Sequence, residues 1–407
     1  MIYWVNQYAI TPDSPGGTRH YEFGKYLKGL DEDVVIVASD LNLYTRQYRL
    51  RSQNNQKPIL ETVQDVKFHW LFATAYQKNN WSRVLSMLSF SWSVFFHLLR
   101  VKTDTKTVFI GSSPHLFAAL VTQMAAWVRG VPFILEIRDL WPETLIDMTG
   151  KKGFQALILR LIANYLYKMA KKIIVLSLSS KEHIAKLGFD SNKIVYIPNG
   201  VDIKDFNFQE KPSSPIELPI NKKIFVYTGA HGPANELGVV LEAAYELQNQ
   251  NQNHIHILLV GDGPSKQELV LQAKELKLQN LTFHDPIKKQ DIPRLLANVD
   301  VGLLILKDAP VFRYGISPNK LFDYMAIGLP VVSNVQGDMA EIIKTANNGI
   351  TVESGNSKAL AVGMLDILRE IDRNSNMGQE GTSYILEHHN REKLAQQVKS
   401  LLKVKND

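Results

Sequence analysis

Short runs of apolar residues alternate with longer segments of helical periodicity along the whole chain. In the first half the runs lie near residues 2–6, 34–39, 66–71, 107–112, 132–137, 172–177 and 194–198. In the second half they lie near residues 223–229, 255–261, 281–285, 300–306 and 330–334. Apolar runs without polar alternation are typical of parallel strands that are buried on both faces. The repeated strand–helix units therefore predict an α/β protein with doubly wound parallel sheets.

The length of 407 residues exceeds what one ordinary hydrophobic core supports, and it predicts two Rossmann-like domains. A segment with four prolines, residues 198–219, contains the expected boundary. We expect a first domain over residues 1–198 and a second over residues 199–389. A helical tail over about residues 390–407 is expected to pack back on the first domain. Ligands of such sheets bind at the carboxyl ends of the strands, so two of them facing each other would form a cleft.

Composition and charge narrow the class of protein. The chain has no cysteine, which fits a reducing compartment and excludes disulfides and thiolate catalysis. The first residues have the pattern of a strand rather than a signal peptide, and the most apolar segment, residues 84–99, is too short and too interrupted to span a membrane. Residues 1–199 hold 24 Lys and Arg against 15 Asp and Glu, whereas the rest holds 22 against 25. This asymmetry predicts that the first half faces an anionic surface.

One lysine stands in an unfavourable position. The stretch SPNKLFDYMAIGLPVV, residues 317–332, predicts a helix with Ser317 as N-cap and Pro318 in its first position. Lys320 then lies in the first turn, where the helix dipole repels a cation by roughly 0.3–1 kcal/mol. A bound anion would remove this cost, because free N–H groups and an ammonium together bind phosphate. The alternative is a solvated lysine, or an ion pair with Asp323 three residues later.

The order of several motifs resembles family 4 glycosyltransferases of the GT-B fold. The second half contributes IPNGVD (197–202), VYTGAHGPANEL (226–237), LLVGDGP (258–264), ANVDVGLLIL (297–306) and the stretch around Lys320. The first half contributes SPGGTRHYEFGKYL (14–27) and EIRDLWPE (136–143). The combination is similar to bacterial transferases that build O-antigen or capsule repeat units, such as the N-acetylfucosamine transferase group. The resemblance extends over nearly the whole chain.

The resemblance implies roles for particular residues. Asp323 would bind the ribose hydroxyls, and Lys320 with the backbone after Gly229 would hold the diphosphate. Ile287, in the loop of residues 285–289, would lie near the base. Glycine lets a backbone approach phosphates closely, which suits a glycine loop that closes over the donor. The implied donor-site residues are Gly16, Gly17, Gly229, His231, Asp262, Ile287, Arg313, Ser317, Pro318, Asn319, Lys320, Leu321 and Asp323.

Two departures from the family pattern affect the donor site. Relatives often carry an arginine and a lysine after the glycine of the second domain's first strand, where this chain has His231 and Asn235. The diphosphate charge would then be met by Lys320, Arg313 and helix N–H groups. Relatives also often have a glutamate eight residues before the Asp323 position, where this chain has Gly315.

Polar residues at the strand ends of the first domain are candidates for the acceptor side. Arg138, Asp139 and Glu143 follow a predicted strand, and we expect Arg138 and Asp139 to act with Lys320 in catalysis and Glu143 to face the acceptor. A structural ion pair is the alternative for this segment. His115 begins a predicted helix at another strand end, where it either faces the acceptor or caps the helix. We expect no metal, because no cluster of His, Asp or Glu has the spacing of a ligand set.

A basic segment predicts contact with a membrane surface. Residues 151–172 hold six Lys and Arg and no acid, and Arg160, Asn164, Lys168 and Lys171 form one polar stripe. That pattern is typical of an amphipathic helix on anionic lipid, and residues 84–99 would add to the same surface. The alternative is a helix that packs its apolar side into its own domain. Nucleic acid is not an expected partner, because no recognised module or basic–aromatic array is present.

Together these features predict an enzyme on the cytoplasmic face of the cell membrane. The resemblance implies a retaining transferase that moves a sugar from a UDP-sugar to a polyprenyl-diphosphate-linked saccharide, in O-antigen or capsule synthesis. An N-acetylated deoxy-sugar such as N-acetylfucosamine is the expected donor sugar. No cofactor is expected. One alternative is a sugar-nucleotide epimerase on the same fold, and another is a non-catalytic nucleotide-binding partner.

Overall fold

The chain forms two compact units in the computed structural model, which describes residues 1–14, 17–43, 45–52, 55–78, 80–150, 153–309, 312 and 315–403. The first unit holds Met1–Pro198 with Arg391–Asp407, and the second holds Asn199–Asn390. The chain therefore passes between the units twice. Both crossings lie within a residue of the positions expected from the sequence.

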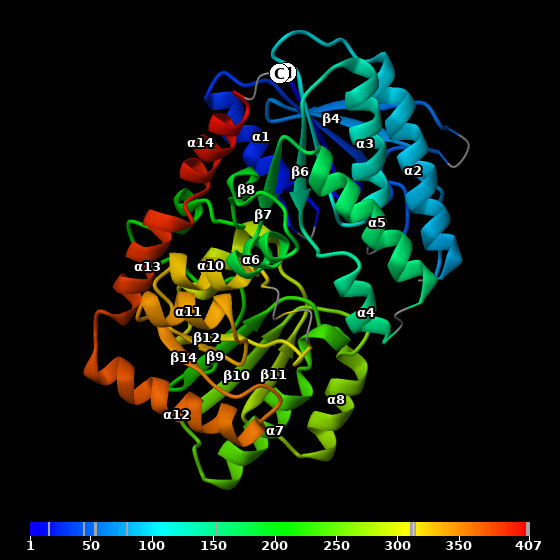
Figure 1. Ribbon diagram of the computed structural model, residues 1–407. Helices are drawn as coiled ribbons and strands as arrows, with labels where there is room; N and C mark the ends of the chain where they lie inside the picture. Colours follow the sequence, from blue (N-terminus) through cyan, green and yellow to red (C-terminus); the bar gives the residue numbers. More distant parts are fainter. Residues whose placement is uncertain are drawn as a thin grey trace. The chain divides into compact units, whose positions relative to one another are not determined.

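The first unit is built on a sheet that has eight strands within the described residues, in the order β3-β4-β2-β1-β5-β6-β7-β8 (Figure 1). Its neighbouring strands are parallel, except that β3 is antiparallel to β4. The strand β3 was missed because it is a half-exposed edge strand, not a buried apolar run. The strands are β1 (Ile2–Val5), β2 (Val34–Ser39), β3 (Ile59–Val63), β4 (Val66–Leu71), β5 (Val108–Ser112), β6 (Phe133–Ile137), β7 (Lys172–Val175) and β8 (Ile194–Tyr196).

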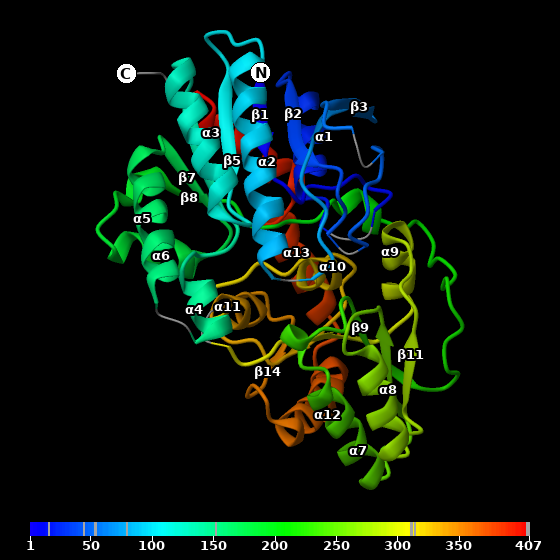
Figure 2. The same ribbon diagram turned by 90° about the vertical axis from the view of Figure 1, so that its right-hand side faces the viewer.

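Helices cover both faces of this sheet. Helices α2, α3 and α5 lie side by side on one face, whereas α1 and α14 lie together on the other (Figures 1 and 2). The C-terminal helix α14 packs Leu394 and Val398 into the core that α1 shares, as expected for the tail. The helices are α1 (Arg19–Gly29), α2 (Trp81–Arg100), α3 (Leu116–Arg129), α4 (Glu143–Thr149), α5 (Phe154–Met169), α6 (Leu178–Lys186) and α14 (Arg391–Leu401).

The second unit has a sheet of six strands within the described residues, in the order β11-β10-β9-β12-β13-β14, and the neighbouring strands are parallel. The two Rossmann-like units confirm the predicted fold class. The strands are β9 (Lys223–Thr228), β10 (Ile255–Val260), β11 (Leu281–His284), β12 (Val301–Leu304), β13 (Val331–Ser333) and β14 (Gly349–Thr351). The helices are α7 (Gly238–Asn249), α8 (Lys266–Glu275), α9 (Ile292–Leu296), α10 (Asn319–Ala326), α11 (Asp338–Thr345), α12 (Ser357–Arg373) and α13 (Met377–His388).

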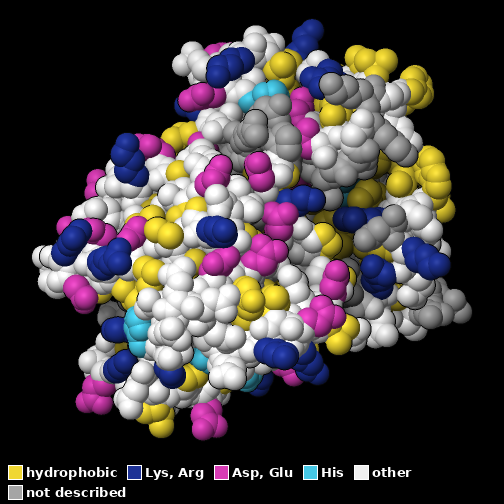
Figure 3. Space-filling model, turned by 90° about the horizontal axis from the view of Figure 1, so that it is seen from below, with side chains coloured by type: hydrophobic (Ala, Val, Ile, Leu, Met, Phe, Trp, Pro, Cys, Tyr) yellow, Lys and Arg dark blue, Asp and Glu magenta, His cyan; other side chains and the backbone are white. Residues whose placement is uncertain are grey.

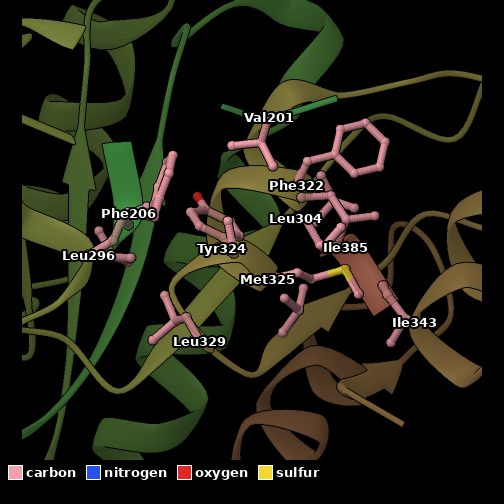
Figure 4. Packing of buried hydrophobic residues seen from close by; sticks show 14 of the residues in the cluster. Val201, Phe206, Leu296, Leu304, Phe322, Tyr324, Met325, Leu329, Ile343 and Ile385 are labelled. Carbon is pink, nitrogen blue, oxygen red and sulfur yellow. The ribbon is translucent and has the colours of Figure 1, made fainter. Parts of the chain in front are cut away.

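Helix α10 is anchored in the core of the second unit (Figure 4). Its residues Phe322, Tyr324 and Met325 are buried, and they pack with side chains from neighbouring elements such as Leu304 and Ile385. The hydroxyl of Tyr324 also accepts a hydrogen bond from the backbone N–H of Thr228, at 3.0 Å. This bond joins α10 to the carboxyl end of β9, where a ligand of a parallel sheet would bind.

Candidate active site

The start of α10 differs from the prediction. The helix begins at Asn319, and Pro318 precedes it with a ψ of 123°, so Pro318 occupies the cap position and has no side-chain donor or acceptor to offer. Ser317 is not the N-cap. Instead its Oγ accepts from the N–H of Asn199 at 2.8 Å, and its carbonyl accepts from the Asn199 side chain at 2.5 Å. The N–H groups of the first turn of α10 thus lack a side-chain cap.

Lys320 is the second residue of α10, and it lies over the end of β9. Its Nζ is 3.8 Å from the centre of the Tyr227 ring. A Cβ on Gly229 would lie only 3.2 Å from the same Nζ, so the lysine head group lies against the backbone of Gly229, where there is no side chain. Burial lowers the pKa of Lys320 to about 7. Within the described parts of the chain no ion pair neutralises it, so an anion that binds beside it would raise this pKa again.

Two glycine turns interlock next to Lys320. The backbone N–H of Gly229 donates to Val260, and that of His231 donates to Asp262, both at 2.9 Å. A Cβ on Gly261 would lie 1.8 Å from the carbonyl oxygen of Gly229, and one on Gly263 would lie 2.5 Å from that of His231. No side chain fits there, and the glycines hold the strand ends of β9 and β10 in close contact.

His231 is fully buried beside these turns. Neither of its ring nitrogens has a hydrogen-bond partner among the described residues. Burial, assisted by the charges of Lys266 and Lys320, lowers the pKa of His231 to about 4. The imidazole is therefore neutral near pH 7 and offers one N–H donor and one lone pair. Buried polar groups without partners are uncommon, and one beside an unneutralised lysine indicates a ligand site.

The remaining predicted donor residues differ in how the structure places them. Asn319 lies at the start of α10 with a buried Oδ1 that has no partner in the described residues, and Asp323 lies half-buried one turn later. Asp262 is exposed, and Ile287 packs against the core. The expectation for Leu321 is wrong as regards its side chain, which is fully buried in the core and leaves only the backbone for a ligand. Gly17 is exposed just before α1, whereas Gly16 and Arg313 lie outside the described residues.

A buried charge network lies at the carboxyl end of the first unit's sheet. The carboxylate of Glu136 is 2.8 Å from Arg19 Nε and 3.1 Å from His20 Nε2. Burial alone would raise the pKa of Glu136, but Arg19 and His20 hold it well below its usual value. Arg19 also donates to the carbonyls of Ile197 and Pro198, the last residues before the chain leaves the unit. We did not predict this network, although a glutamate inside an apolar strand was a signal for it.

The predicted acceptor-side residues do not form one cluster. The structure brings Glu143 to Arg160 and His183, at 3.1 and 3.5 Å, so Glu143 forms the structural ion pair that was the alternative. Asp139 is exposed at the end of β6, and the backbone N–H of the half-buried Arg138 donates to Ser113. His115 occupies the cap position of α3 without capping it, and its Nε2 is 2.6 Å from Gln7 Oε1.

No group of three or more His, Cys, Asp or Glu among the described residues is placed to hold a metal ion. None of their helices is both long and apolar enough to cross a bilayer.

Comparison with known proteins identifies the class. A model described as a glycosyl transferase 4-like domain matches residues 16–200, and one described as glycosyl transferases group 1 matches residues 222–370. The chain also superimposes on Anabaena Alr3699/HepE, solved with UDP and glucose, with a TM-score of 0.66, 16% identity and 98% of each chain covered. With sucrose-phosphate synthase from Thermosynechococcus elongatus the TM-score is 0.72 at 16% identity, over 98% of this chain and 97% of that one. The protein is a GT-B glycosyltransferase, an enzyme of the hexosyltransferase type.

Two curated relatives have names that state a more specific activity. The chain is 25% identical over 305 residues to the putative colanic acid biosynthesis glycosyl transferase WcaI of Escherichia coli (strain K12), which covers 72% of this chain and 74% of that protein. It is 26% identical over 244 residues to an Escherichia coli UDP-Gal:alpha-D-GlcNAc-diphosphoundecaprenol alpha-1,3-galactosyltransferase, which covers 58% of this chain and 59% of that protein.

Proposed function

We propose that the enzyme transfers a sugar from a UDP-sugar to a saccharide carried on a polyprenyl diphosphate, in the synthesis of a bacterial surface polysaccharide. One observation carries the proposal of a UDP-sugar donor. Lys320, which lacks a counterion in the described residues, and the ring of His231, which has no hydrogen-bond partner there, lie at the same place in the second unit. Both lie at the carboxyl ends of β9 and β10, beside glycine turns that expose backbone. The names of the curated relatives support the acceptor half, and an N-acetylated deoxy-sugar remains the proposed donor sugar.

In this proposal the second unit binds the donor and stabilises its departure. The bond between the sugar C1 and the diphosphate breaks, and a bond forms from C1 to the acceptor oxygen, with retention of configuration. Lys320 and the uncapped N–H groups of α10 stabilise the negative charge on the departing diphosphate. The diphosphate takes the proton from the acceptor hydroxyl. No metal takes part in the proposed mechanism.

The proposed acceptor is a lipid, and the face formed by α2, α3 and α5 supports contact with a membrane. These three helices contain no acidic residue, and their exposed face carries large apolar side chains. Figure 3 shows hydrophobic side chains gathered at its right-hand edge, the side on which α2 lies in Figure 1. The most exposed are Trp81, Leu85, Trp92, Trp127, Val128, Phe154, Leu157 and Leu161, each between 54% and 76% accessible.

The orientation of α5 favours the membrane over the alternative of packing into its own domain. Its buried residues are Ala156, Ala163, Leu166 and Tyr167, whereas Phe154, Leu157 and Leu161 are exposed. A helix that only covers its own sheet would not be expected to leave several large apolar side chains exposed as well. Aromatic and apolar groups without acids, with Lys168 nearby, suit the interface of an anionic membrane.

Nucleotide release tests the function. The protein is incubated with UDP-, GDP- and ADP-sugars, with and without a membrane lipid extract, and the free nucleotide is measured. UDP that appears only with lipid supports the transferase and its acceptor together. UDP-sugar that is converted to its epimer without lipid would instead identify the epimerase.

Vesicle binding tests the membrane face separately. Wild type and a Trp81→Ala/Trp92→Ala variant are sedimented with vesicles that contain phosphatidylglycerol. The matched control is Leu271→Ala, which removes a side chain of similar exposure, 60%, from α8 in the second unit. Binding should fall in the first variant and persist in the control. Equal binding by all three proteins contradicts the assignment of this face.

A further inference from the structure

A second polar cluster lies at the carboxyl end of the first unit's sheet, apart from the buried Glu136 network. Gln7 and Tyr8 follow β1, and Tyr76 follows β4. Arg83 lies in the first turn of α2, and His115 occupies the cap position of α3. Because α2 and α3 are neighbouring crossover helices, both begin at this edge, and their positive dipole ends point toward it.

His115 is held in one tautomer. Gln7 Oε1 can only accept, so the bond of 2.6 Å from His115 places the proton on Nε2. The Gln7 side chain reaches Ser86 on its other side, at 3.5 Å. His115 Nδ1 is then a bare lone pair, in a side chain with 3% exposure and without a partner among the described residues. Such a nitrogen is suited to accept a hydroxyl hydrogen.

Arg83 supplies positive charge to the same place. Burial raises the pKa of Tyr8, and the Arg83 guanidinium counteracts that rise. Burial, together with the positive charge of Arg83, lowers the pKa of His115 to about 3. The first turns of α2 and α3 contain no acid. Asp139 lies within electrostatic reach of both Arg83 and Arg138, so these three groups leave a net charge of one positive unit.

Tyr76 adds a donor to the cluster. Its side chain is 3% exposed, and its hydroxyl has no hydrogen-bond partner in the described residues. Together with the two helix N-termini and Arg83, this is the composition of an anion site: charge-assisted and neutral donors, with no acid in the first turns of the two helices.

We propose that Arg83, Tyr76 and His115 form the site for the diphosphate of the lipid-linked acceptor, with His115 Nδ1 accepting a hydroxyl of the sugar beside it. This inference rests on the proposed function. The donor diphosphate has its own site at Lys320 in the other unit. Moreover, Trp81 and Leu85 present exposed apolar surface from the same turns of α2 that hold Arg83. One helix thus combines an anion site and an apolar face, as an amphiphilic diphosphate requires.

The test compares Arg83→Gln with Arg100→Gln, which removes an exposed arginine from the opposite end of α2. The KM for a polyprenyl-diphosphate acceptor should rise about tenfold or more in Arg83→Gln, the loss expected for one charge-assisted hydrogen bond. The KM for the UDP-sugar should stay within about twofold of wild type, since Lys320 is intact. Arg83→Lys should recover part of the acceptor affinity.

Direct binding separates this inference from the proposed function. Farnesyl diphosphate is titrated into wild type, Arg83→Gln and Tyr76→Phe, and the last variant removes only one oxygen. Weaker binding in both variants supports the site even where no transfer is detected. Equal binding in all three proteins, or a raised UDP-sugar KM in Arg83→Gln, overturns it. An Arg83→Gln variant that does not fold leaves Tyr76→Phe to decide between these outcomes.

Discussion

Replacement of Lys320 by methionine is the most direct perturbation of the proposed donor site. Methionine keeps an unbranched apolar stem over the Tyr227 ring, where the lysine Nζ lies 3.8 Å from the ring centre, and removes only the charge. Two unit charges about 4 Å apart interact by about 4 kcal/mol at the effective dielectric of a partly buried site. Loss of a single preorganised donor to a developing anion lowers turnover by roughly 10²–10³-fold. We expect a fall of that size in kcat/KM for the UDP-sugar.

Stability should not explain that loss. Because burial lowers the pKa of Lys320 to about 7, folding disfavours its charged form, and an apolar replacement relieves this cost. The Tm of Lys320→Met should therefore equal or exceed that of wild type. The assay is initial-rate UDP release beside thermal unfolding, with the exposed Lys344→Met of α11 as the control. Wild-type kcat/KM in Lys320→Met would refute the assignment of this lysine to the donor diphosphate.

Three further outcomes follow from the same contacts. The diphosphate of a UDP-sugar does not titrate near pH 7. The affinity for the UDP-sugar should therefore be steady below pH 7 and fall above it as Lys320, with a pKa of about 7, loses its proton. Calorimetry at several pH values measures this affinity, and Lys320→Met should show no such pH dependence. Transfer should continue in EDTA, and a loss that added Mg²⁺ restores would contradict the metal-free mechanism. Glu136→Gln should lower the free energy of unfolding by about 3–5 kcal/mol, because it leaves the buried Arg19 without its counterion; urea titration measures this, and a loss below about 1 kcal/mol would be inconsistent with the pair.

The sequence was sufficient to predict the parallel strands and the two units, because buried apolar runs have a local signature. It missed β3, whose half-exposed residues alternate, and it placed the start of α10 too early. Ser317 has the composition of an N-cap, but its hydroxyl is bonded to Asn199, 118 residues earlier in the chain. Local propensity cannot anticipate a competing partner at that separation.

The same limit applies to the site residues. Lys320 was recognisable because its position in a first turn is unfavourable within its own helix. Glu143 was assigned to the acceptor because it follows a strand end, but its partner Arg160 lies on another helix. Arg19 and Glu136 are 117 residues apart, and Arg83 comes within electrostatic reach of His115 only because α2 and α3 begin at one edge of the sheet. Such pairings depend on the order of the strands, which the apolar pattern does not encode.

The histidine at the end of β9 has a consequence for how the donor charge is met. Where relatives often carry an arginine and a lysine, this chain has a buried imidazole whose pKa of about 4 leaves it uncharged near pH 7. His231 Nε2 already lies 3.3 Å from where a Cβ on Gly261 would be, so a longer side chain could not extend there without moving the turn. In the proposed donor site His231 can thus orient a phosphate oxygen but cannot neutralise its charge. Lys320 and the first turn of α10 must then neutralise more of the diphosphate charge. Loss of Lys320 should therefore lower kcat/KM for the UDP-sugar more in this enzyme than loss of one cation does in a relative that has several.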